Sequence, residues 1–441
     1  MREFMRAEGT KTFSVVWFGQ LVSLLGSSMT GFGLAIWVFQ ETGSATQLAL
    51  IVMASRIPML LVSPFVGALV DRWDRRTAML ISDTGAAVGT LVTMLLVVTG
   101  SLEIWHLYLT LSFSGAFAAF QFPAYSAAVT QLIPKEHYAR ASGMVQLAGS
   151  VGGILAPVAA AAIVVSAGLG PLFVADVASY LVAVTTLLAV RFPKAEKSER
   201  RGRGVMALLR EAREGLTFIT ARRGLLILVL SFLMVNFAFA FQGVLTIPLL
   251  LNLTDGQTAG LIVSAGAAGV AVGSLALAAW GGPRNKIIGV YVPIMAMGVG
   301  LVMMGLRPSV WLVTAGLLLM LGTHPIAGGS SQAIWQAKVP PNLQGRVFAI
   351  RQISAISASP IAFLSAGLLA DRVFEPMFAD GGSPLTAVFG SGAGRGIGFL
   401  FACTGLVAIA ITIWALRHPR IRNLDTEVPD ADLLETRAEA A

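Results

Sequence analysis

The amino-acid sequence predicts an all-α, polytopic membrane protein with twelve transmembrane helices in two six-helix halves. Three observations predict this class. Hydrophobic residues make up 56% of the chain and charged residues only 12%, which is about half the charged share of an average soluble domain. Twelve apolar runs divide the 441 residues, and each can form the helix of about 20 residues that crosses a bilayer. One long polar segment separates the first six runs from the last six.

The expected spans follow one another with short polar turns between them, and most carry almost no charge. Only Arg56 interrupts residues 45–66, and only Asp83 interrupts residues 77–102. The first run is longer than the 7–15 apolar residues of a cleaved signal peptide, so we interpret it as a retained span. The spans are expected at residues 13–39, 45–70, 77–100, 103–131, 141–166, 169–191, 225–251, 257–281, 286–306, 309–337, 345–370 and 395–416.

These spans divide the chain into four segments. Residues 1–191 form the N-terminal half and residues 225–416 the C-terminal half, while residues 417–441 are expected to be a cytoplasmic tail without fixed structure. Residues 192–224 form a cytoplasmic linker. Apolar residues at helical spacing over 204–220 predict an amphipathic helix at the membrane surface, and a solvated linker with one interfacial turn is the alternative.

The basic residues predict the orientation. With the N-terminus inside, 27 of the 31 Lys and Arg residues fall on the cytoplasmic side and three outside, a strong positive-inside bias. Both termini are therefore expected in the cytoplasm of a multi-pass cell-membrane protein. The net charge of +8 is then explained by anionic lipid and not by nucleic acid. The lone Cys403 excludes a disulfide within the chain.

An internal repeat supports two related halves. Three pairs of residues are each 206 positions apart in the expected loops 4–5 and 10–11 and the spans that follow: Pro134 and Pro340, Arg140 and Arg346, and Gln146 and Gln352. Carriers built from two parallel six-span repeats have this organisation.

A charged turn between spans 2 and 3 carries the most specific motif. It reads Gly67-Ala68-Leu69-Val70-Asp71-Arg72-Trp73-Asp74-Arg75-Arg76-Thr77-Ala78-Met79-Leu80. It resembles the loop 2–3 motif of the major facilitator superfamily, with Asp74 in place of a glycine. The resemblance implies the major facilitator fold, alternating access, and a conformational clamp; the alternative is a simple positive-inside anchor. The clamp residues would be Gly67, Asp71, Arg72, Arg75 and Arg76.

Other segments resemble one branch of that superfamily. The residues Trp17-Phe18-Gly19-Gln20, Phe173-Val174-Ala175-Asp176 and Gly345-Arg346-Val347-Phe348-Ala349 are similar to the transmembrane secretion effector group. The resemblance covers residues 12–416 and implies export of a drug, a macrolide or a siderophore.

Ionisable side chains inside spans are candidates for function because each costs about 2.5–3.5 kcal/mol on insertion scales. Asp83 and Asp176 are candidates for proton coupling, and Arg56 for modulating it or holding an anionic substrate. The alternative is structural pairing between helices, in which Asp83 would join Arg72 or Arg75.

Polar uncharged side chains in the spans are candidates for the substrate pocket, with ordinary packing as the alternative. For the histidine among them, a hydrogen-bonded core position is favoured over proton transfer. The candidates are Gln20, Ser27, Gln121, Gln146, Asn236, Gln242, His324 and Gln352.

No enzyme motif is present. The chain lacks Gly-x-x-x-x-Gly-Lys-Ser/Thr and any Cys/His metal spacing, so neither a cofactor nor a metal is expected. We expect a secondary active exporter of a hydrophobic or amphiphilic small molecule, working as a monomer by proton antiport. The alternatives are a carrier of another solute or a lipid on the same fold, and a non-transporting membrane receptor.

Overall fold

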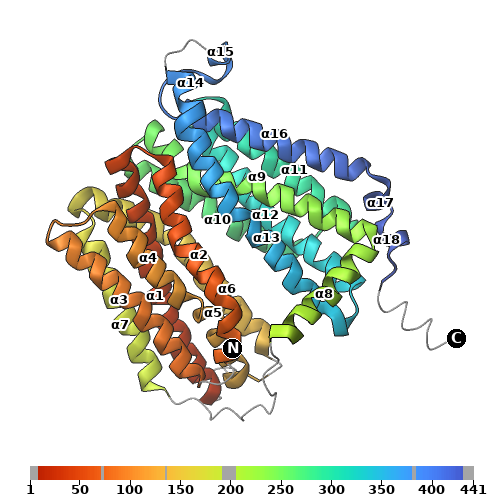
Figure 1. The fold of residues 1–441 in the computed structure, drawn as a ribbon, viewed down its shortest axis with the longest axis horizontal. Coiled ribbons are helices and arrows are strands. Elements are labelled where there is room, and N and C mark those ends of the chain that lie inside the picture. The colour runs from red at the N-terminus through yellow and green to blue at the C-terminus, as the bar shows by residue number, and fades with distance from the viewer. Residues whose placement is uncertain (1–7, 71–73, 135–136, 191–204, 380–383, 431–441) are drawn as a thin grey trace. The chain divides into compact units, whose positions relative to one another are not determined.

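The computed structural model describes residues 8–70, 74–134, 137–190, 205–379 and 384–430. Throughout these residues every regular element is a helix (Figure 1). Within the same ranges, eleven helices are long and apolar enough to cross a membrane. The predicted all-α, polytopic class is therefore confirmed, and the difference between eleven and twelve has a local cause.

The fourth predicted span is two helices instead of one. α4 (Ile104–Ala118) and α5 (Gln121–Leu132) are separated at Ala119 and Phe120. In a continuous helix the Ala119 carbonyl would accept a hydrogen bond from residue 123. That residue is Pro123, which has no N–H and whose ring collides with the carbonyl four residues earlier. The span predicted over 103–131 is therefore interrupted next to Pro123, and neither piece alone has the length of a span.

Contacts between Cα atoms divide the chain into two compact units. Unit 1 comprises Met1–Gly202 with Asp255–Ser264, and unit 2 comprises Arg203–Thr254 with Ala265–Ala441. The main division thus falls inside the predicted linker.

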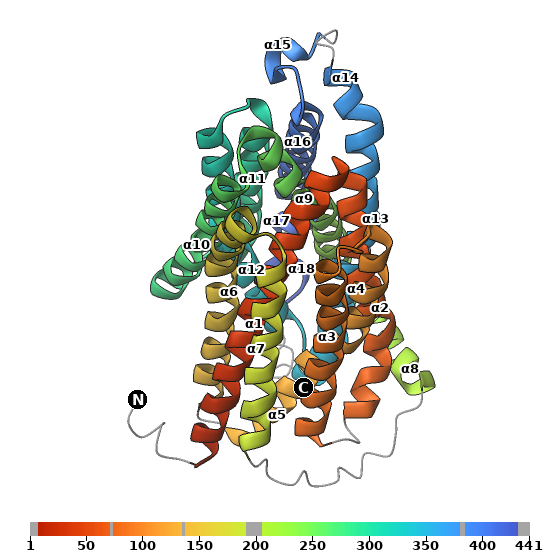
Figure 2. The ribbon, with the colours of Figure 1, turned by 90° about the vertical axis from the view of Figure 1, so that its left-hand side faces the viewer.

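Unit 1 is a bundle around α1. Its N-terminal helix packs against α6 and α7, α2 packs against α4, and α3 lies against α4 and α7; Figure 2 shows α1 and α7 side by side. Val16, Met79, Phe120 and Leu187 are buried at its centre. Besides α4 and α5, its helices are α1 (Glu8–Thr42), α2 (Ala45–Val70), α3 (Arg75–Val98), α6 (Tyr138–Ala167) and α7 (Gly170–Ala189).

Three glycines of α1 permit its close approach to α7. They are spaced by seven residues, which places them on one face of the helix. A Cβ atom at any of them would overlap a side chain of α7. The facing pairs are Gly19 with Thr186, Gly26 with Ser179, and Gly33 with Leu172.

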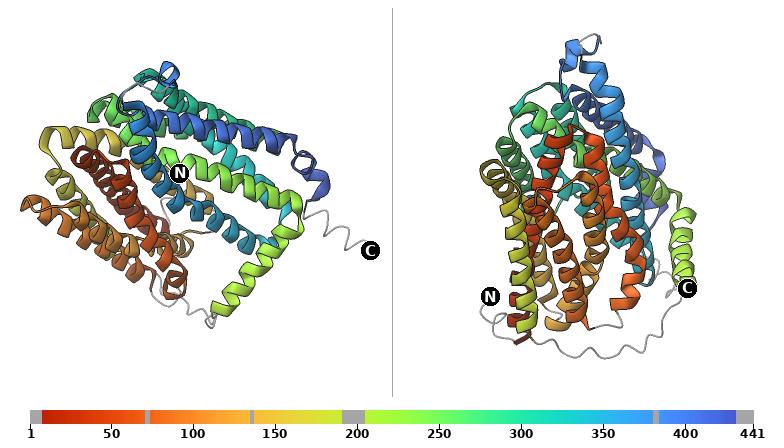
Figure 3. Two further views of the ribbon diagram at one scale, coloured as in Figure 1. Left: turned by 45° about the horizontal axis from the view of Figure 1, so that its top comes forward. Right: turned by 60° about the vertical axis from the view of Figure 1, so that its left-hand side comes forward.

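Unit 2 has a larger helical core. α9, α13 and α16 lie side by side (Figure 3), and α11 packs between α12 and α16. Trp335 and Tyr291 are fully buried, and the Tyr291 hydroxyl lies 2.8 Å from Ser231 Oγ. Its long helices are α8 (Val205–Ala221), α9 (Arg223–Leu253), α10 (Gly256–Trp280, whose start groups with unit 1), α11 (Lys286–Leu306), α12 (Val310–Lys338), α13 (Pro341–Leu369) and α16 (Arg395–Arg417).

Short helices complete unit 2. They are the π-helix η3 (Ala370–Phe374), α14 (Glu375–Ala379), α15 (Thr386–Phe389), α17 (Pro419–Arg422) and α18 (Leu424–Glu427).

The predicted amphipathic helix is α8, and it packs on protein. Phe218 and Ile219 are buried in the core of unit 2. Arg346 Nη1 of α13 lies 2.6 Å from Glu214 Oε2 of α8. Leu216 remains half exposed. The helix extends over 17 residues, and its place at the membrane surface stays a prediction.

The segment after α16 also packs against unit 2. Ile421, Leu424 and Val428 are buried, and Lys338 Nζ lies 2.9 Å from Asp430 Oδ1. The expectation of a tail without fixed structure is therefore wrong for residues 417–430. Residues 431–441 lie outside the described residues.

Candidate functional site

The predicted clamp is described only in part. Gly67 lies in the last turns of α2 and Arg75 begins α3, whereas Asp71 and Arg72 lie outside the described residues. Arg76 Nη2 donates to the Leu188 carbonyl oxygen at 2.7 Å, close to the C-terminus of α7. A cation is favourable there because the last carbonyls of a helix carry partial negative charge. This contact ties the start of α3 to α7, and the clamping role itself stays a prediction.

Three predicted candidates, Asp83, Gln20 and Gln121, form one hydrogen-bonded cluster. The Asp83 carboxylate is buried in α3, and Gln20 Nε2 of α1 donates to Asp83 Oδ2 at 2.9 Å. Gln121 Nε2, at the start of α5, donates to Gln20 Oε1. Among the described residues Asp83 forms no ion pair, so the expected pairing with Arg75 is not observed there. A chain of two neutral amides therefore leads to this carboxylate.

A second cluster surrounds Asp176 of α7, which is 1% exposed. Ser27 Oγ of α1 donates to Asp176 Oδ1 at 3.2 Å, and Thr90 Oγ1 of α3 donates to Asp176 Oδ2 at 3.5 Å. The Tyr180 hydroxyl lies 2.8 Å from Ser27 Oγ. Within the described ranges this carboxylate likewise has only neutral hydrogen-bond partners.

The two clusters occupy one seam between α1, α3 and α7. Ser27 follows Gln20 by seven residues on α1, and Thr90 follows Asp83 by seven residues on α3. Seven residues correspond to about two helical turns, or roughly 10 Å. The two carboxylates therefore lie about two helical turns apart along the seam. Because their partners are neutral, each can gain or lose a proton without the breaking of an ion pair.

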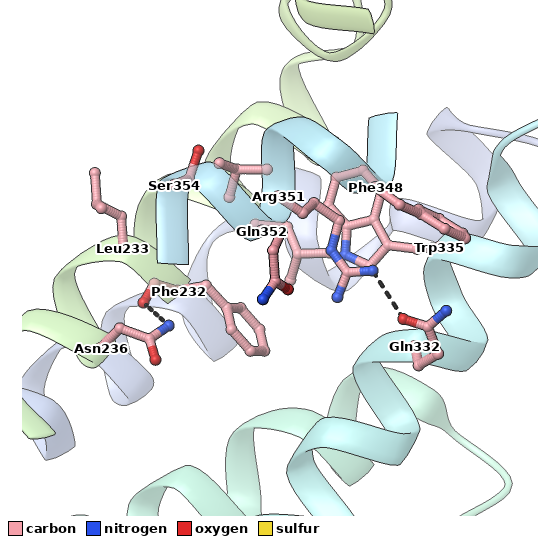
Figure 4. Close-up of a pocket in the computed structure, with 11 residues that line it drawn as sticks. Phe232, Leu233, Asn236, Gln332, Trp335, Phe348, Arg351, Gln352 and Ser354 are labelled. Carbon is pink, nitrogen blue, oxygen red and sulfur yellow. Dashed lines mark hydrogen bonds between the residues drawn. The ribbon is translucent and has the colours of Figure 1, made fainter. Parts of the chain in front are cut away.

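Unit 2 contains a polar cavity of about 180 Å³ beside Arg351 of α13 (Figure 4). Arg351 Nη1 donates to Gln332 Oε1 at 3.0 Å and Nη2 to Ser331 Oγ at 3.3 Å. Two predicted candidates line the same cavity, Asn236 and Gln352. The other lining residues are Leu228, Val229, Phe232, Leu233, Gln332, Trp335, Phe348 and Ser354.

Arg351 lies in the cytoplasmic third of predicted span 11, where the sequence marks it as an in-span cation without assigning it a role. The positive-inside count assigns it to the cytoplasmic loop residues, although it lies within predicted span 11. Its position inside a span is the signal that marks it, since a cation there is costly.

A larger apolar cavity of about 630 Å³ adjoins the polar one between α9, α13 and α16. Leu233 lines both. The remaining lining residues are Met234, Phe237, Ala238, Phe241, Ala358, Ile361, Thr404, Val407 and Ile411.

The other candidates lie apart from these sites. Arg56, Gln146 and His324 are exposed, and none forms a hydrogen bond or ion pair with another described residue. The hydrogen bond expected for His324 in the core is therefore not observed among the described residues. Gln242 Nε2 donates to Thr246 Oγ1 within α9 at 2.9 Å.

The helices are long and apolar enough to cross a membrane, and they enclose a carboxylate seam and a polar cavity. These features define a polytopic membrane transporter. Residues 16–364 match the family model of the Major Facilitator Superfamily, and the chain belongs to that family.

Solved transporters share the fold. A bacterial homologue of the human lysosomal transporter Spinster, inward-facing and unoccupied, superposes with a TM-score of 0.70 at 16% identity, covering 93% of this chain and 97% of that one. The nucleoside transporter NupG superposes with a TM-score of 0.68 at 10% identity, covering 92% and 99%.

Relatives by sequence are named as efflux proteins. Macrolide efflux protein A of Streptococcus pyogenes is 26% identical over 421 residues, covering 94% of this chain and 97% of that protein. Multidrug efflux pump Tap of Mycolicibacterium fortuitum is 22% identical, covering 93% and 96%. The resemblance to the exporter branch is thereby confirmed.

Proposed function

We propose that this protein exports a hydrophobic or amphiphilic small molecule of the drug, macrolide or siderophore class by proton antiport. The names of its relatives support efflux of macrolides and other drugs, and the siderophore class rests on the sequence resemblance alone. The observation that carries proton coupling is the seam in which Asp83 and Asp176 accept hydrogen bonds from neutral groups only, among the described residues.

The seam couples protonation to water access. An ionised aspartate at the centre of a membrane helix costs about 2.5–3.5 kcal/mol on insertion scales, and protonation removes that cost. A conformation that hydrates the seam therefore favours the ionised form, while one that closes it favours the protonated form. Since the linkage is reciprocal, proton binding favours closure. Opening alternately to the two sides then moves protons inward as substrate moves outward.

The remaining candidates have supporting roles in this proposal. The turn between α2 and α3 clamps the cytoplasmic ends of the bundle, and Arg56, exposed within α2, pairs with substrate charge. In the same proposal, both termini of the chain lie in the cytoplasm. The clamp comprises Gly67, Asp71, Arg72, Arg75 and Arg76.

The test is flux in proteoliposomes with an imposed pH gradient. Asp83→Asn and Asp176→Asn keep the side-chain volume and remove the titrating group. Gradient-driven efflux of a macrolide should fall by about tenfold or more in each variant, because a single carboxamide cannot carry the proton, while exchange without a gradient should persist.

The matched control is Asp255→Asn, which changes an exposed aspartate before α10 and should leave efflux unchanged. Wild-type pH dependence in both seam variants would show that these carboxylates do not carry the coupling proton. Failure of the wild-type protein to move any compound of the panel would overturn the export proposal.

A further inference from the structure

Arg351 is a cation inside a membrane helix that forms no ion pair with any residue the structure describes. Burying a charge in an apolar environment is costly unless the charge is paired. Among the described residues no carboxylate pairs with Arg351, whose hydrogen-bond partners are the neutral Gln332 and Ser331. A guanidinium has five N–H donors, and these contacts use two. Donors therefore remain for a ligand.

Neighbouring side chains fix this cation at the cavity wall. The guanidinium carbon lies 4.9 Å from the ring centroid of Trp335 and 5.7 Å from that of Phe348, within the range of cation–π contacts. Trp335 is 1% exposed, so its ring forms a rigid wall. Figure 4 shows the Arg351 guanidinium between the Gln332 and Gln352 side chains. A guanidinium ordered in this way suits carboxylate or phosphate oxygens.

The volume of the polar cavity limits what binds there. Its 180 Å³ correspond to about six water molecules at their volume in the liquid. A carboxylate or phosphate group fits this space, whereas the ring of a macrolide does not. Asn236 and Gln352 add amide groups for the remaining oxygens.

An apolar site adjoins the polar one. The 630 Å³ cavity is lined by the rings of Phe237 and Phe241 and by Ile361. Because Leu233 lines both cavities, a molecule with a polar end and an apolar body can occupy both at once.

We propose that the two cavities together bind an anionic amphiphile, with its negatively charged group at Arg351 and its apolar body between α9, α13 and α16. This inference rests on the proposed export function and narrows its substrate class. A cationic amphiphile is disfavoured there by like charge.

The test is binding of dansyl-undecanoic acid to the full-length protein in phosphatidylcholine nanodiscs, with the signal of empty nanodiscs subtracted. The uncharged methyl ester of the same probe is the matched ligand. Arg351→Gln should weaken binding of the acid by about tenfold, the size expected for loss of a charge-assisted pair, and leave the ester unchanged. Arg351→Lys should recover part of the affinity.

Arg372→Gln is the matched control, because it removes an equally charged but exposed side chain from unit 2 and should bind like wild type. Equal affinities of the Arg351→Gln and Arg372→Gln variants for the acid would overturn the anion site. These measurements use no gradient. Binding without efflux would therefore leave this inference standing while the export proposal failed.

Two further experiments test the apolar cavity and the source of the ligand. Phe237→Ala should weaken the binding of dansyl-undecanoic acid but not the binding of dansyl-glycine. Equal effects on both affinities would overturn the proposal that the apolar body binds between α9, α13 and α16. Phosphatidylglycerol added to the nanodiscs should displace the probe in an Arg351-dependent way if resident lipid is the anion. Absence of that displacement, with Arg351-dependent binding retained, supports a free amphiphile.

Discussion

Asp255 shows how one carboxylate fixes the start of a membrane helix. Its Oδ1 accepts a hydrogen bond from the Thr258 backbone N–H at 2.9 Å, and its Oδ2 accepts one from the Thr258 hydroxyl at 2.8 Å. These bonds, led by the backbone N–H, hold the pKa of Asp255 below its usual range. Since the ionised form is favoured in the folded protein, it stabilises the first turn of α10.

The lowered pKa determines how the stabilisation by Asp255 changes with pH. A carboxylate with a lowered folded pKa stabilises above the unfolded pKa, about 3.9 for aspartate, and this stability is lost as pH falls through the folded pKa. The difference in Tm between wild type and Asp255→Ala should therefore be largest at neutral pH and shrink in acid. The difference between Asp255→Asn and Asp255→Ala should not change with pH, because neither side chain titrates. A wild-type advantage that stays constant in acid would contradict this assignment.

Single residues of the seam were predictable, but their grouping was not. Gln20, Asp83 and Gln121 are each marked by polarity within an apolar run. Their hydrogen bonds join positions 63 and 101 residues apart, so they depend on which helices pack together. Of the two alternative partners, Arg75 forms no ion pair with Asp83 among the described residues, and Arg72 lies outside them, so that pairing stays a prediction.

At the scale of elements, the α1–α7 contact positions one of the two carboxylates. Gly26 lies opposite Ser179, which is three residues from Asp176 on α7. The absence of a side chain at Gly26 lets the backbones approach, and this approach brings Ser27 within hydrogen-bond distance of Asp176.

Gly26→Ala should therefore destabilise the protein. The added Cβ would lie 2.9 Å from Ser179 Cβ and 3.0 Å from Asp176 Oδ1, and overpacking of this kind costs about 1–3 kcal/mol. Gly31→Ala is the control on the same helix, since a Cβ there meets nothing within 4 Å. It should be neutral or gain about 0.5–1 kcal/mol from reduced chain entropy. Thermal unfolding in detergent measures both, and equal Tm values would contradict the packing argument.

The break between α4 and α5 shows why proline alone does not locate a kink. Pro157, Pro248 and Pro325 lie inside continuous helices, whereas Pro123 follows an actual break. Composition does not separate the two cases, because neighbouring helices decide whether the lost hydrogen bond can be tolerated. Here the break begins α5 at Gln121, which joins the Asp83 cluster.

At the scale of the whole molecule, hydropathy and charge predicted most of the architecture. Apolar runs are set by the bilayer thickness, so composition alone reveals them. The segment after α16 escaped prediction because its polar residues outnumber its apolar ones. The only indication in the sequence is the spacing of Ile421, Leu424 and Val428, which is typical of one face of a helix, although the segment forms two short helices, α17 and α18. All three are buried.

The ion pair between Lys338 and Asp430 has a practical consequence for shortening or tagging this protein. Lys338 is 4% exposed and its carboxylate partner is 49% exposed. Ending the chain after Arg417 removes that carboxylate together with three buried side chains, each worth about 1.5–3 kcal/mol. Such a chain should melt well below one that ends after Asp430, as thermal unfolding of the two purified proteins would show. Equal melting would mean that the segment is dispensable. Protease sites and fluorescent fusions therefore belong downstream of Asp430.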